Sequence, residues 1–377
     1  MSFRRHGPAT VAGALLLALP LGAMAQMTLT PAGQAAGFTL TTFASGLPNF
    51  GAGSEGPFGT ASTSDGHILV DSSPNSTIYV FADTDGQTPA SALSKTTFAS
   101  FATALTNSNG TIFGSGGLGA LGGSNSHFGP DAYQLLKFSN TGVATVIDTS
   151  PLTNMSGAGL ATDFVNGHIL TQQATGFIGG SPGGIPQTEA LYDYDPATNT
   201  ARLITTYSAV TSMGDGVVVS ADGKTVYVAF KGTDPVNTTL TGAISGWDLT
   251  TRDPVFTMSI PGTPDGMGII QGGRFSGDLV SNNNDGTVDL IDPTTGSITM
   301  IASGGSRGDY TGQDLLNGSL FLSQTDSILR LSCGTGCSFG GGGGGGGGGG
   351  VPEPATLGLL GLGLLGMQLV QRVRRRH

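Results

Sequence analysis

The sequence predicts an all-β protein: a six-bladed β-propeller closed by its N-terminal strand, with a secretion signal before it and a C-terminal transmembrane sorting helix after it. Three observations support this prediction. The chain is rich in glycine, with 65 among 377 residues, and only 11% of its residues are charged. One turn-and-strand pattern recurs six times. One extra strand precedes the first copy, and the last copy lacks its final strand, so the extra strand can complete the last blade.

The first 25 residues predict a cleavable signal peptide. They begin with Arg4 and Arg5, continue with an apolar stretch over 11–21, and end in Ala23-Met24-Ala25. Two small residues separated by one other residue form the pattern that signal peptidase recognises. The apolar stretch is too short to span a membrane. We therefore expect a signal peptide over 1–25 and a folded domain over 26–338.

The folded domain repeats a polar residue, a glycine and an apolar run, as in Asp65-Gly66-His67-Ile68-Leu69-Val70. Asx-Gly pairs favour tight β-hairpin turns, because such turns need residues with positive φ. The turns lie 41 to 57 residues apart, which is the length of one four-stranded blade. The six turns begin at Asp65, Asn109, Asn166, Asp222, Ser276 and Asn317.

Ring closure accounts for the last blade. Five repeats continue into a further strand, whereas the sixth stops at Leu331. The stretch 38–43 is a strand that precedes the first repeat, and adding it to the sixth blade removes an open sheet edge. The second repeat is irregular, with a glycine-rich stretch over 114–123, so rings of five or seven blades stay open as alternatives. A β-helix does not suit so long a period.

Two cysteines, Cys333 and Cys337, follow the last predicted strand. An exported protein folds in an oxidising compartment, where a close cysteine pair favours a disulfide, and a metal site would need more ligands. We therefore expect a Cys333–Cys337 disulfide that staples the end of the last strand.

The C-terminal tail has three parts. Glycines make 339–350 a flexible linker, Pro352-Glu353-Pro354 follows, and an apolar helix over about 355–371 leads to a cluster of arginines that ends the segment 351–377. About 16 apolar residues are just enough to cross a bilayer, and the arginines favour the cytoplasmic side. The tail thus predicts a membrane-spanning helix with the propeller facing outward. A permanent anchor without processing is the alternative.

This order of Pro-Glu-Pro, short apolar helix and arginines resembles the PEP-CTERM sorting signal, also called the ice-binding protein C-terminal motif. The resemblance implies a Gram-negative host that makes exopolysaccharide, and an exosortase that cleaves at or near Pro352, Glu353 and Pro354. The expected partners are then signal peptidase and exosortase during export, with the inner membrane at least transiently. We expect the protein in the cell envelope or outside the cell, either released or anchored.

The charge distribution excludes one class of partner. The formal net charge is −10, and six of the arginines lie in the two end segments, so the folded domain is more acidic than the whole chain. Nucleic acids need a basic face, so we expect no nucleic-acid partner. A cation or a neutral sugar is compatible with such a surface.

Carboxylates recur in the loops that enter the innermost strands, and in a propeller these loops surround the mouth of the central channel. Three of the loops carry an acid followed by glycine, at Glu55, Asp215 and Asp265, and Asp309 opens the last blade. Clustered carboxylates repel one another unless a cation or a proton lies among them, and their oxygens suit Ca²⁺ or Mg²⁺. The sequence therefore predicts a divalent-cation site held by Glu55, Asp215 and Asp265. The alternative is that each acid–glycine pair is only a turn.

Two of these loops, Glu55-Gly56-Pro57 and Pro264-Asp265-Gly266-Met267, resemble loops of the gluconolactonase and senescence-marker-type propellers. The resemblance implies that Glu55 and Asp265 are ligands of a divalent metal and that the region of Asp265 also supplies a general base. This chain departs from the family at two places. It has Asp215-Gly216 where the family usually has Asn-Gly, and its loop 156–159 lacks the Asn ligand of an intermediate blade.

The function expected from these features is that of an exported, surface-associated binding or matrix module of the envelope. Its ligand would be exopolysaccharide, another envelope protein or a small molecule. The alternative is a metal-dependent lactone hydrolase in which Asp265 or Asp309 takes a proton from water. A sugar dehydrogenase with a quinone cofactor is disfavoured, since the sequence has no basic cluster to hold that cofactor. His67 and His168 share one turn position, and we expect both to be surface turn residues.

Overall fold

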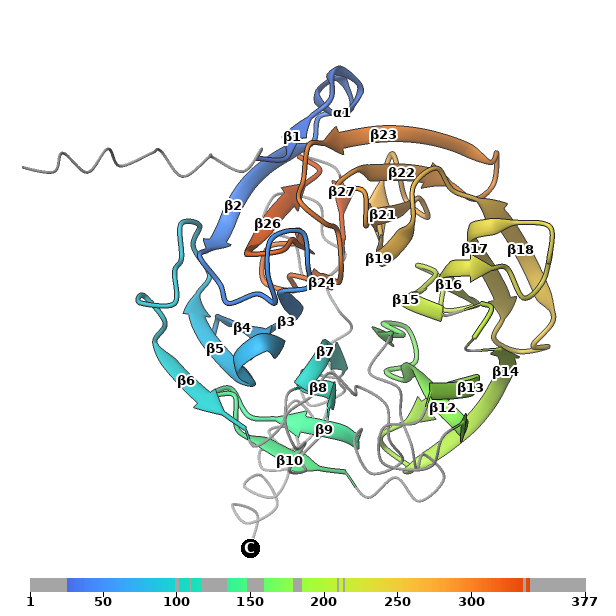
Figure 1. The fold of residues 1–377 in the computed structure, drawn as a ribbon, viewed down its shortest axis with the longest axis horizontal. Coiled ribbons are helices and arrows are strands. Elements are labelled where there is room, and N and C mark those ends of the chain that lie inside the picture. Colours follow the sequence, from blue (N-terminus) through green and yellow to red (C-terminus); the bar gives the residue numbers. More distant parts are fainter. Residues whose placement is uncertain are drawn as a thin grey trace, which may run out of the picture.

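Six antiparallel β-sheets surround a central axis as the blades of a propeller (Figure 1). The structure is a computed structural model, and it describes residues 26–98, 102–108, 110–116, 134–147, 159–178, 185–208, 210–212, 214–334 and 337–339. The first strand of each blade lies next to the axis, and the later strands follow outward. The predicted all-β class and the six-bladed ring are confirmed.

The first three blades are four-stranded sheets whose strands pair in chain order. Blade 1 contains β3 (Pro57–Ser62), β4 (His67–Ser72), β5 (Thr77–Ala82) and β6 (Ser94–Thr97), with the 3₁₀ turn η1 (Ser73–Asn75) between β4 and β5. Blade 2 contains β7 (Ala102–Ser108), β8 (Thr111–Gly116), β9 (Gln134–Phe138) and β10 (Ala144–Val146). Blade 3 contains β11 (Leu160–Thr162), β12 (Ile169–Ile178), β13 (Ile185–Asp195) and β14 (Thr200–Ser208).

Blade 4 is also four-stranded and contains β15 (Gly214–Val219), β16 (Thr225–Thr233), β17 (Thr241–Asp248) and β18 (Pro254–Ser259). Blades 5 and 6 each receive a strand from the N-terminal segment. Blade 5 contains β19 (Pro264–Ile269), β21 (Leu279–Asn283), β22 (Val288–Asp292), β23 (Ser297–Ser303) and, outermost, β1 (Thr28–Leu29). Blade 6 contains β24 (Thr311–Gln313), β25 (Leu320–Ser323), β26 (Ser327–Ser332) and, outermost, β2 (Thr39–Ser45).

The six repeated turns have the backbone that the sequence predicts. The glycine of every copy has a positive φ, between 69° and 94°. Only glycine adopts such angles without a steric cost, which explains why this residue type recurs at each turn. The glycines are Gly66, Gly110, Gly167, Gly223, Gly277 and Gly318.

The N-terminal strand closes the ring, as predicted. β2 pairs antiparallel with β26, from Thr39 opposite Ser332 to Ser45 opposite Ser327. At the closure, Arg330 of β26 forms ion pairs with Asp83 and Asp85 of blade 1 and lies 3.5 Å from Asp314 in blade 6. The last blade is therefore joined to the first by side chains as well as by the borrowed strand.

Two elements near the N-terminus were not predicted. β1 adds a fifth strand to blade 5, with Thr28 opposite Ser303. The short helix α1 (Pro31–Ala35) follows it, capped by the Thr30 hydroxyl, which accepts a hydrogen bond from the amide of Gly33 at 3.1 Å. A proline at the first helical position and a threonine cap are typical of such helix starts. The N-terminal segment therefore contacts blades 5 and 6 in succession.

The chain after the last blade folds back onto blade 5. β27 (Cys337–Ser338) pairs with β20 (Gly272–Gly273) in a small separate sheet. Cys333 and Cys337 form a disulfide with their Cα atoms 5.6 Å apart, and Phe339 beyond it is fully buried. The disulfide thus lies between the end of β26 and this added sheet.

The predicted signal peptide over 1–25 and the predicted transmembrane helix over about 355–371 lie outside the described residues. The predicted linker over 339–350 also lies outside them, except for its first residue, the buried Phe339. Within the described part of the chain, no helix has the length and apolar character needed to cross a membrane.

Candidate functional site

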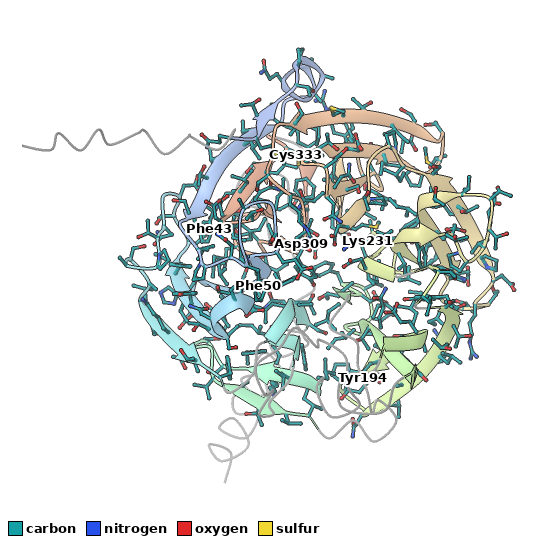
Figure 2. The ribbon with its side chains drawn as sticks, in the orientation of Figure 1. Phe43, Phe50, Tyr194, Lys231, Asp309 and Cys333 are labelled. Atoms are coloured by element: carbon teal, nitrogen blue, oxygen red, sulfur yellow. A yellow bond between two sulfur atoms is a disulfide. The ribbon has the colours of Figure 1, made fainter. Side chains whose placement is uncertain are left out.

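The four predicted carboxylates all lie where innermost strands begin, at one mouth of the channel. Asp215 and Asp265 are in β15 and β19, Asp309 precedes β24, and Glu55 precedes β3. They are joined in two pairs by basic residues. Figure 2 shows Lys231 and Asp309 near the centre of the ring. The sequence prediction named the acids, and it missed both basic partners.

Lys231 joins the first pair of acids. It lies on β16, its ammonium forms an ion pair with Asp215, and its Nζ is 2.7 Å from Oδ2 of Asp265. The Lys231 side chain is 19% exposed and the Asp265 side chain only 1%. Burial opposes the charge on Lys231, yet the carboxylates of Asp215, Asp265 and Asp309 together raise the pKa of its ammonium above the usual value. Lys231 is therefore charged at all physiological pH values.

Arg307 joins the second pair. Its Nη2 is 3.2 Å from Oε1 of Glu55, and its Nε is 3.9 Å from Oδ2 of Asp309. The same Nε donates a hydrogen bond to Oδ1 of Asn284 at 3.1 Å, which orients the guanidinium. A signal for this contact is present in the sequence, because Arg307 is only two residues from Asp309.

The two deepest carboxyls of the mouth bind protons more tightly than usual. Burial, followed by repulsion from Asp215, raises the pKa of Asp265 well above its ordinary value, although Lys231 opposes this shift. Burial also raises the pKa of Asp309 to about 7, against the opposing effect of Lys231. Protons therefore supply part of the positive charge that the carboxylates need.

The donor set does not match a divalent-metal site. In the described ranges no group of three or more His, Cys, Asp or Glu side chains is placed to hold a metal ion. The ammonium of Lys231 lies between two of the three predicted ligands, and the third, Glu55, faces Arg307. Ca²⁺ and Mg²⁺ take six or more oxygen ligands, bound water included, and either ion would meet a fixed positive charge at this position. The bound cation stays a prediction from the sequence.

The glycines of the acid–glycine motif have a structural role. A Cβ on Gly216 would be 2.0 Å from the carbonyl oxygen of Asp265, and a Cβ on Gly266 would be 2.0 Å from that of Asp309. In both cases the carbonyl belongs to the next blade. Glycine therefore lets neighbouring innermost strands approach closely, which explains the repeat of the motif without any ligand.

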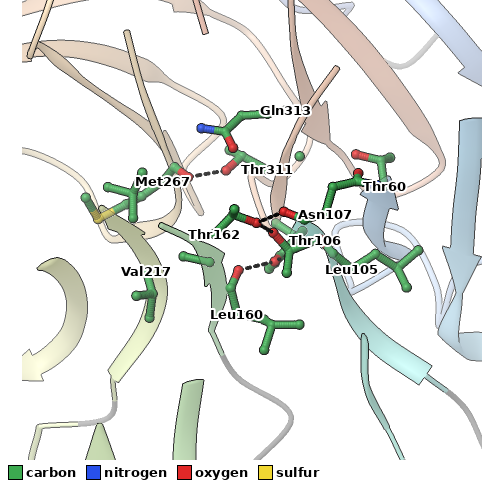
Figure 3. Close-up of a pocket in the computed structure, with 14 residues that line it drawn as sticks. Thr60, Leu105, Thr106, Asn107, Leu160, Thr162, Val217, Met267, Thr311 and Gln313 are labelled. Atoms are coloured by element: carbon green, nitrogen blue, oxygen red, sulfur yellow. Dashed lines mark hydrogen bonds between the residues drawn. The ribbon is translucent and has the colours of Figure 1, made fainter. Parts of the chain in front are cut away.

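Tyr310 lies across the channel below the mouth. Its hydroxyl donates a hydrogen bond to the carbonyl of Leu160, on the opposite blade, at 2.7 Å. Next to it lies a polar cavity of about 30 Å³, with room for one water molecule (Figure 3). Hydroxyl and amide side chains line this cavity, among them Thr60, Thr106, Asn107, Thr162, Thr311 and Gln313. The channel at this level is therefore filled by side chains.

A second polar site lies in a groove of about 410 Å³ between blades 3 and 4. Here Asp193 is 8% exposed and has a partner on each carboxylate oxygen: Nδ1 of His168 at 2.8 Å and Nη2 of Arg202 at 3.0 Å. Arg202 also donates to the carbonyl of Leu249 in blade 4, so it links the two walls. Asp163, Asn166, Asp195, Thr200, Gly223 and Thr250 complete much of the lining.

Sequence reasoning missed this groove. His168 does lie in the turn before β12, as predicted, but its side chain contacts Asp193 of β13 and lines the groove. Asp193 is 25 residues away along the chain, and the two meet because β12 and β13 pair with Leu170 opposite Asp193. His67 holds the equivalent position in blade 1, and its ring lies 3.1 Å from the carboxylate of Asp65 in its own turn.

Comparison with known proteins supports the predicted sorting motif in the tail and the predicted propeller fold. Residues 350–376 match the PEP-CTERM protein-sorting motif. No curated protein matches the chain. A gluconolactonase from Xanthomonas campestris is structurally similar, with a TM-score of 0.58, 14% identity, and coverage of 81% of this chain and 94% of that one.

Two further solved structures align less closely. A streptogramin B lyase has a TM-score of 0.44 at 15% identity over 78% of this chain and 97% of that one. The WD40 β-propeller domain of Doa1 has a TM-score of 0.43 at 14% identity over 73% and 78%. At such identities the likeness concerns the fold alone. The sorting motif and the six blades together describe an exported protein with an exosortase sorting signal, built as a six-bladed β-propeller.

Proposed function

We propose that this exported propeller is a binding module of the envelope, and that it holds a neutral, hydroxyl-rich sugar chain in the groove between blades 3 and 4. The observation that carries this proposal is the fixed arrangement of His168, Asp193 and Arg202 along that groove. The sorting motif supports it as well, because exosortase sorting implies export and membrane anchoring.

The groove has the chemistry that a sugar needs. With Nδ1 of His168 bound to Asp193, the imidazole keeps its second nitrogen for another partner. The exposed amide of Asn166 and the carboxylate of Asp195 add groups that donate or accept hydrogen bonds. A volume of about 410 Å³ lies in the range of small-molecule sites, roughly 300–1,000 Å³. A neutral chain is favoured because the acids of the groove would repel an anionic one.

Calorimetric titration of the purified full-length chain with neutral gluco- and manno-oligosaccharides tests this proposal. We expect binding by at least one of them, and a loss of about tenfold or more with His168→Gln or Arg202→Gln, since hydrogen bonds to charged or fixed partners contribute about 1.5–3 kcal/mol. His67→Gln is the matched control and should bind as the wild type does. Binding that is absent, or equal in all variants, would overturn the proposal.

The second candidate is a metal-dependent lactone hydrolase, favoured by one observation. A carboxyl whose pKa is about 7, that of Asp309, is suited to act as a general base at neutral pH. Asp265 is the other candidate base. Hydrolysis of gluconolactone, measured with Ca²⁺, Mg²⁺ or Mn²⁺ and with chelator, tests this candidate. We expect no metal-dependent turnover, and turnover that disappears in Asp309→Asn would replace the binding proposal.

A further inference from the structure

The channel mouth contains a positive charge of its own where the sequence predicts a bound cation. Asp215 and Asp265 belong to neighbouring innermost strands, and Asp265 is almost completely buried. Two carboxylates so close together in a poorly hydrated site destabilise the fold unless a proton is taken up or a positive charge lies between them. The structure places the Nζ of Lys231 at that position.

A local feature of blade 4 directs Lys231 to this position. β16 pairs regularly with β17 as far as Phe230 opposite Ala243, and pairing resumes at Thr233 opposite Thr241. Lys231 and Gly232 therefore stand opposite the single residue Gly242, as a β-bulge. A bulge breaks the alternation of side chains along a strand and commonly redirects one of them beside a functional site. Gly232 permits this course, because a Cβ there would be 2.1 Å from the carbonyl oxygen of Thr211.

We propose that the ammonium of Lys231 is the built-in counter-ion of the channel mouth and takes the place of the divalent cation expected of gluconolactonase-type propellers. Arg307 serves the other half of the mouth in the same way, since it pairs with Glu55 and Asp309. Two fixed cations thus divide the four carboxylates, and no oxygen set is left for a metal ion. This inference is independent of the sugar groove between blades 3 and 4.

Replacement of Lys231 tests the inference. Lys231→Gln leaves Asp215 and Asp265 without their cation, so the full-length variant should melt several degrees below the wild type in the presence of chelator. Addition of millimolar Ca²⁺ or Mn²⁺ should then raise its Tm by at least about 3 °C, because a ligand that binds only the folded state stabilises that state. Wild type and Lys224→Gln should respond to neither metal nor chelator. Lys224 is a fair control, since it lies on an exposed turn of the same blade and pairs with Asp222 at 3.4 Å.

A second variant keeps the inference testable if Lys231→Gln folds poorly. Asp215→Asn in the Lys231→Gln background removes one of the two acids, so it should recover part of the lost Tm and should not respond to metal. Three results would overturn the inference: a stoichiometric divalent ion in the purified wild type, a Tm of the wild type that falls on chelation, or a double variant no more stable than the single one. Sugar binding in the groove should be unchanged in Lys231→Gln, which separates this test from that of the proposed function.

Discussion

At the residue scale, Glu189 is a carboxyl whose pKa is raised mainly by burial. It lies on β13 with its side chain fully enclosed, and its Oε2 accepts a hydrogen bond from the amide of Gly214 at 3.2 Å. Burial, with repulsion from Asp215 as the second cause, raises the pKa of Glu189 to about 8 from a usual value of 4.5. The folded state therefore binds this proton more tightly than the unfolded state does.

The raised pKa predicts how stability changes with pH. The protonated carboxyl is favoured in the fold, so its contribution is fully present below pH 4.5 and is lost as pH rises toward 8, at about 1.4 kcal/mol per pH unit. Glu189→Gln should remove this slope and leave the variant more stable than the wild type at pH 8. Urea titrations of both proteins at pH 5, 6.5 and 8 measure the difference. Parallel curves for the two proteins would contradict the assignment.

Lys231 and Arg307 show what residue-level reading of the sequence finds and misses. The acids at the mouth were predicted from a motif that recurs at blade entries, which is local information. Lys231 is 16 residues from Asp215 and 34 from Asp265, and it reaches them through a bulge in β16 that has no sequence signature. Arg307, by contrast, is two residues from Asp309, and a charge of opposite sign so near an acid could have been taken as its partner.

At the scale of elements, the innermost strands depend on glycine for their spacing. A Cβ at Gly266 of β19 would overlap the backbone of blade 6 at the carbonyl of Asp309. Gly272 in the same blade has open space where its Cβ would be. The acid–glycine motif therefore combines a packing requirement at glycine with a charge requirement at the acid.

Alanine substitutions at Gly266 and Gly272 test whether the close approach of neighbouring strands requires glycine. Gly266→Ala should destabilise the propeller by at least about 2 kcal/mol, since the added methyl group must displace the backbone of the next blade. For a domain of this size that corresponds to a Tm lower by roughly 3 °C or more. Gly272→Ala should change the Tm by about 1 °C at most. Equal effects of the two substitutions would show that the close approach at Gly266 is not required.

Elements with a repeated signal were predictable, and those without one were not. Six turns and the closing strand follow from the period and from the strand missing in the last repeat. The unpredicted elements each occur once and contain only two to five residues; they are β1, α1, β20 and β27. Their positions depend on neighbours that are distant in sequence, such as Ser303 for Thr28. Periodicity carries no information about such additions.

At the scale of the whole molecule, one mostly enclosed arginine links the two ends of the ring. Arg330 pairs with Asp83 and Asp85 of blade 1 and faces Asp314, which is fully buried. Its guanidinium also lies over the rings of Phe43 and Phe321, at 5.0 and 5.1 Å from their centroids. Arg330 thus contacts the closing strand, its own blade and the first blade at once.

Arg330→Met should open the ring at this junction. Removal of the guanidinium leaves the fully buried carboxylate of Asp314 without a counter-charge, which costs about 3–5 kcal/mol, whereas the aliphatic part of the side chain is retained. The more exposed Asp83 and Asp85 add little to this cost. We expect a lower Tm and faster proteolysis of the N-terminal segment that carries β2, because that strand then keeps only its backbone pairing with β26 and its backbone hydrogen bonds with Gly86 and Gln87 of blade 1. Lys95→Met is the control. Lys95 lies on β6, the outer strand of blade 1, with its ammonium 5.4 Å from the ring of Tyr79, and its replacement should leave the Tm and the proteolysis rate equal to those of the wild type. If Arg330→Met melts as the wild type does, the backbone pairing of β2 with β26 is sufficient to close the propeller.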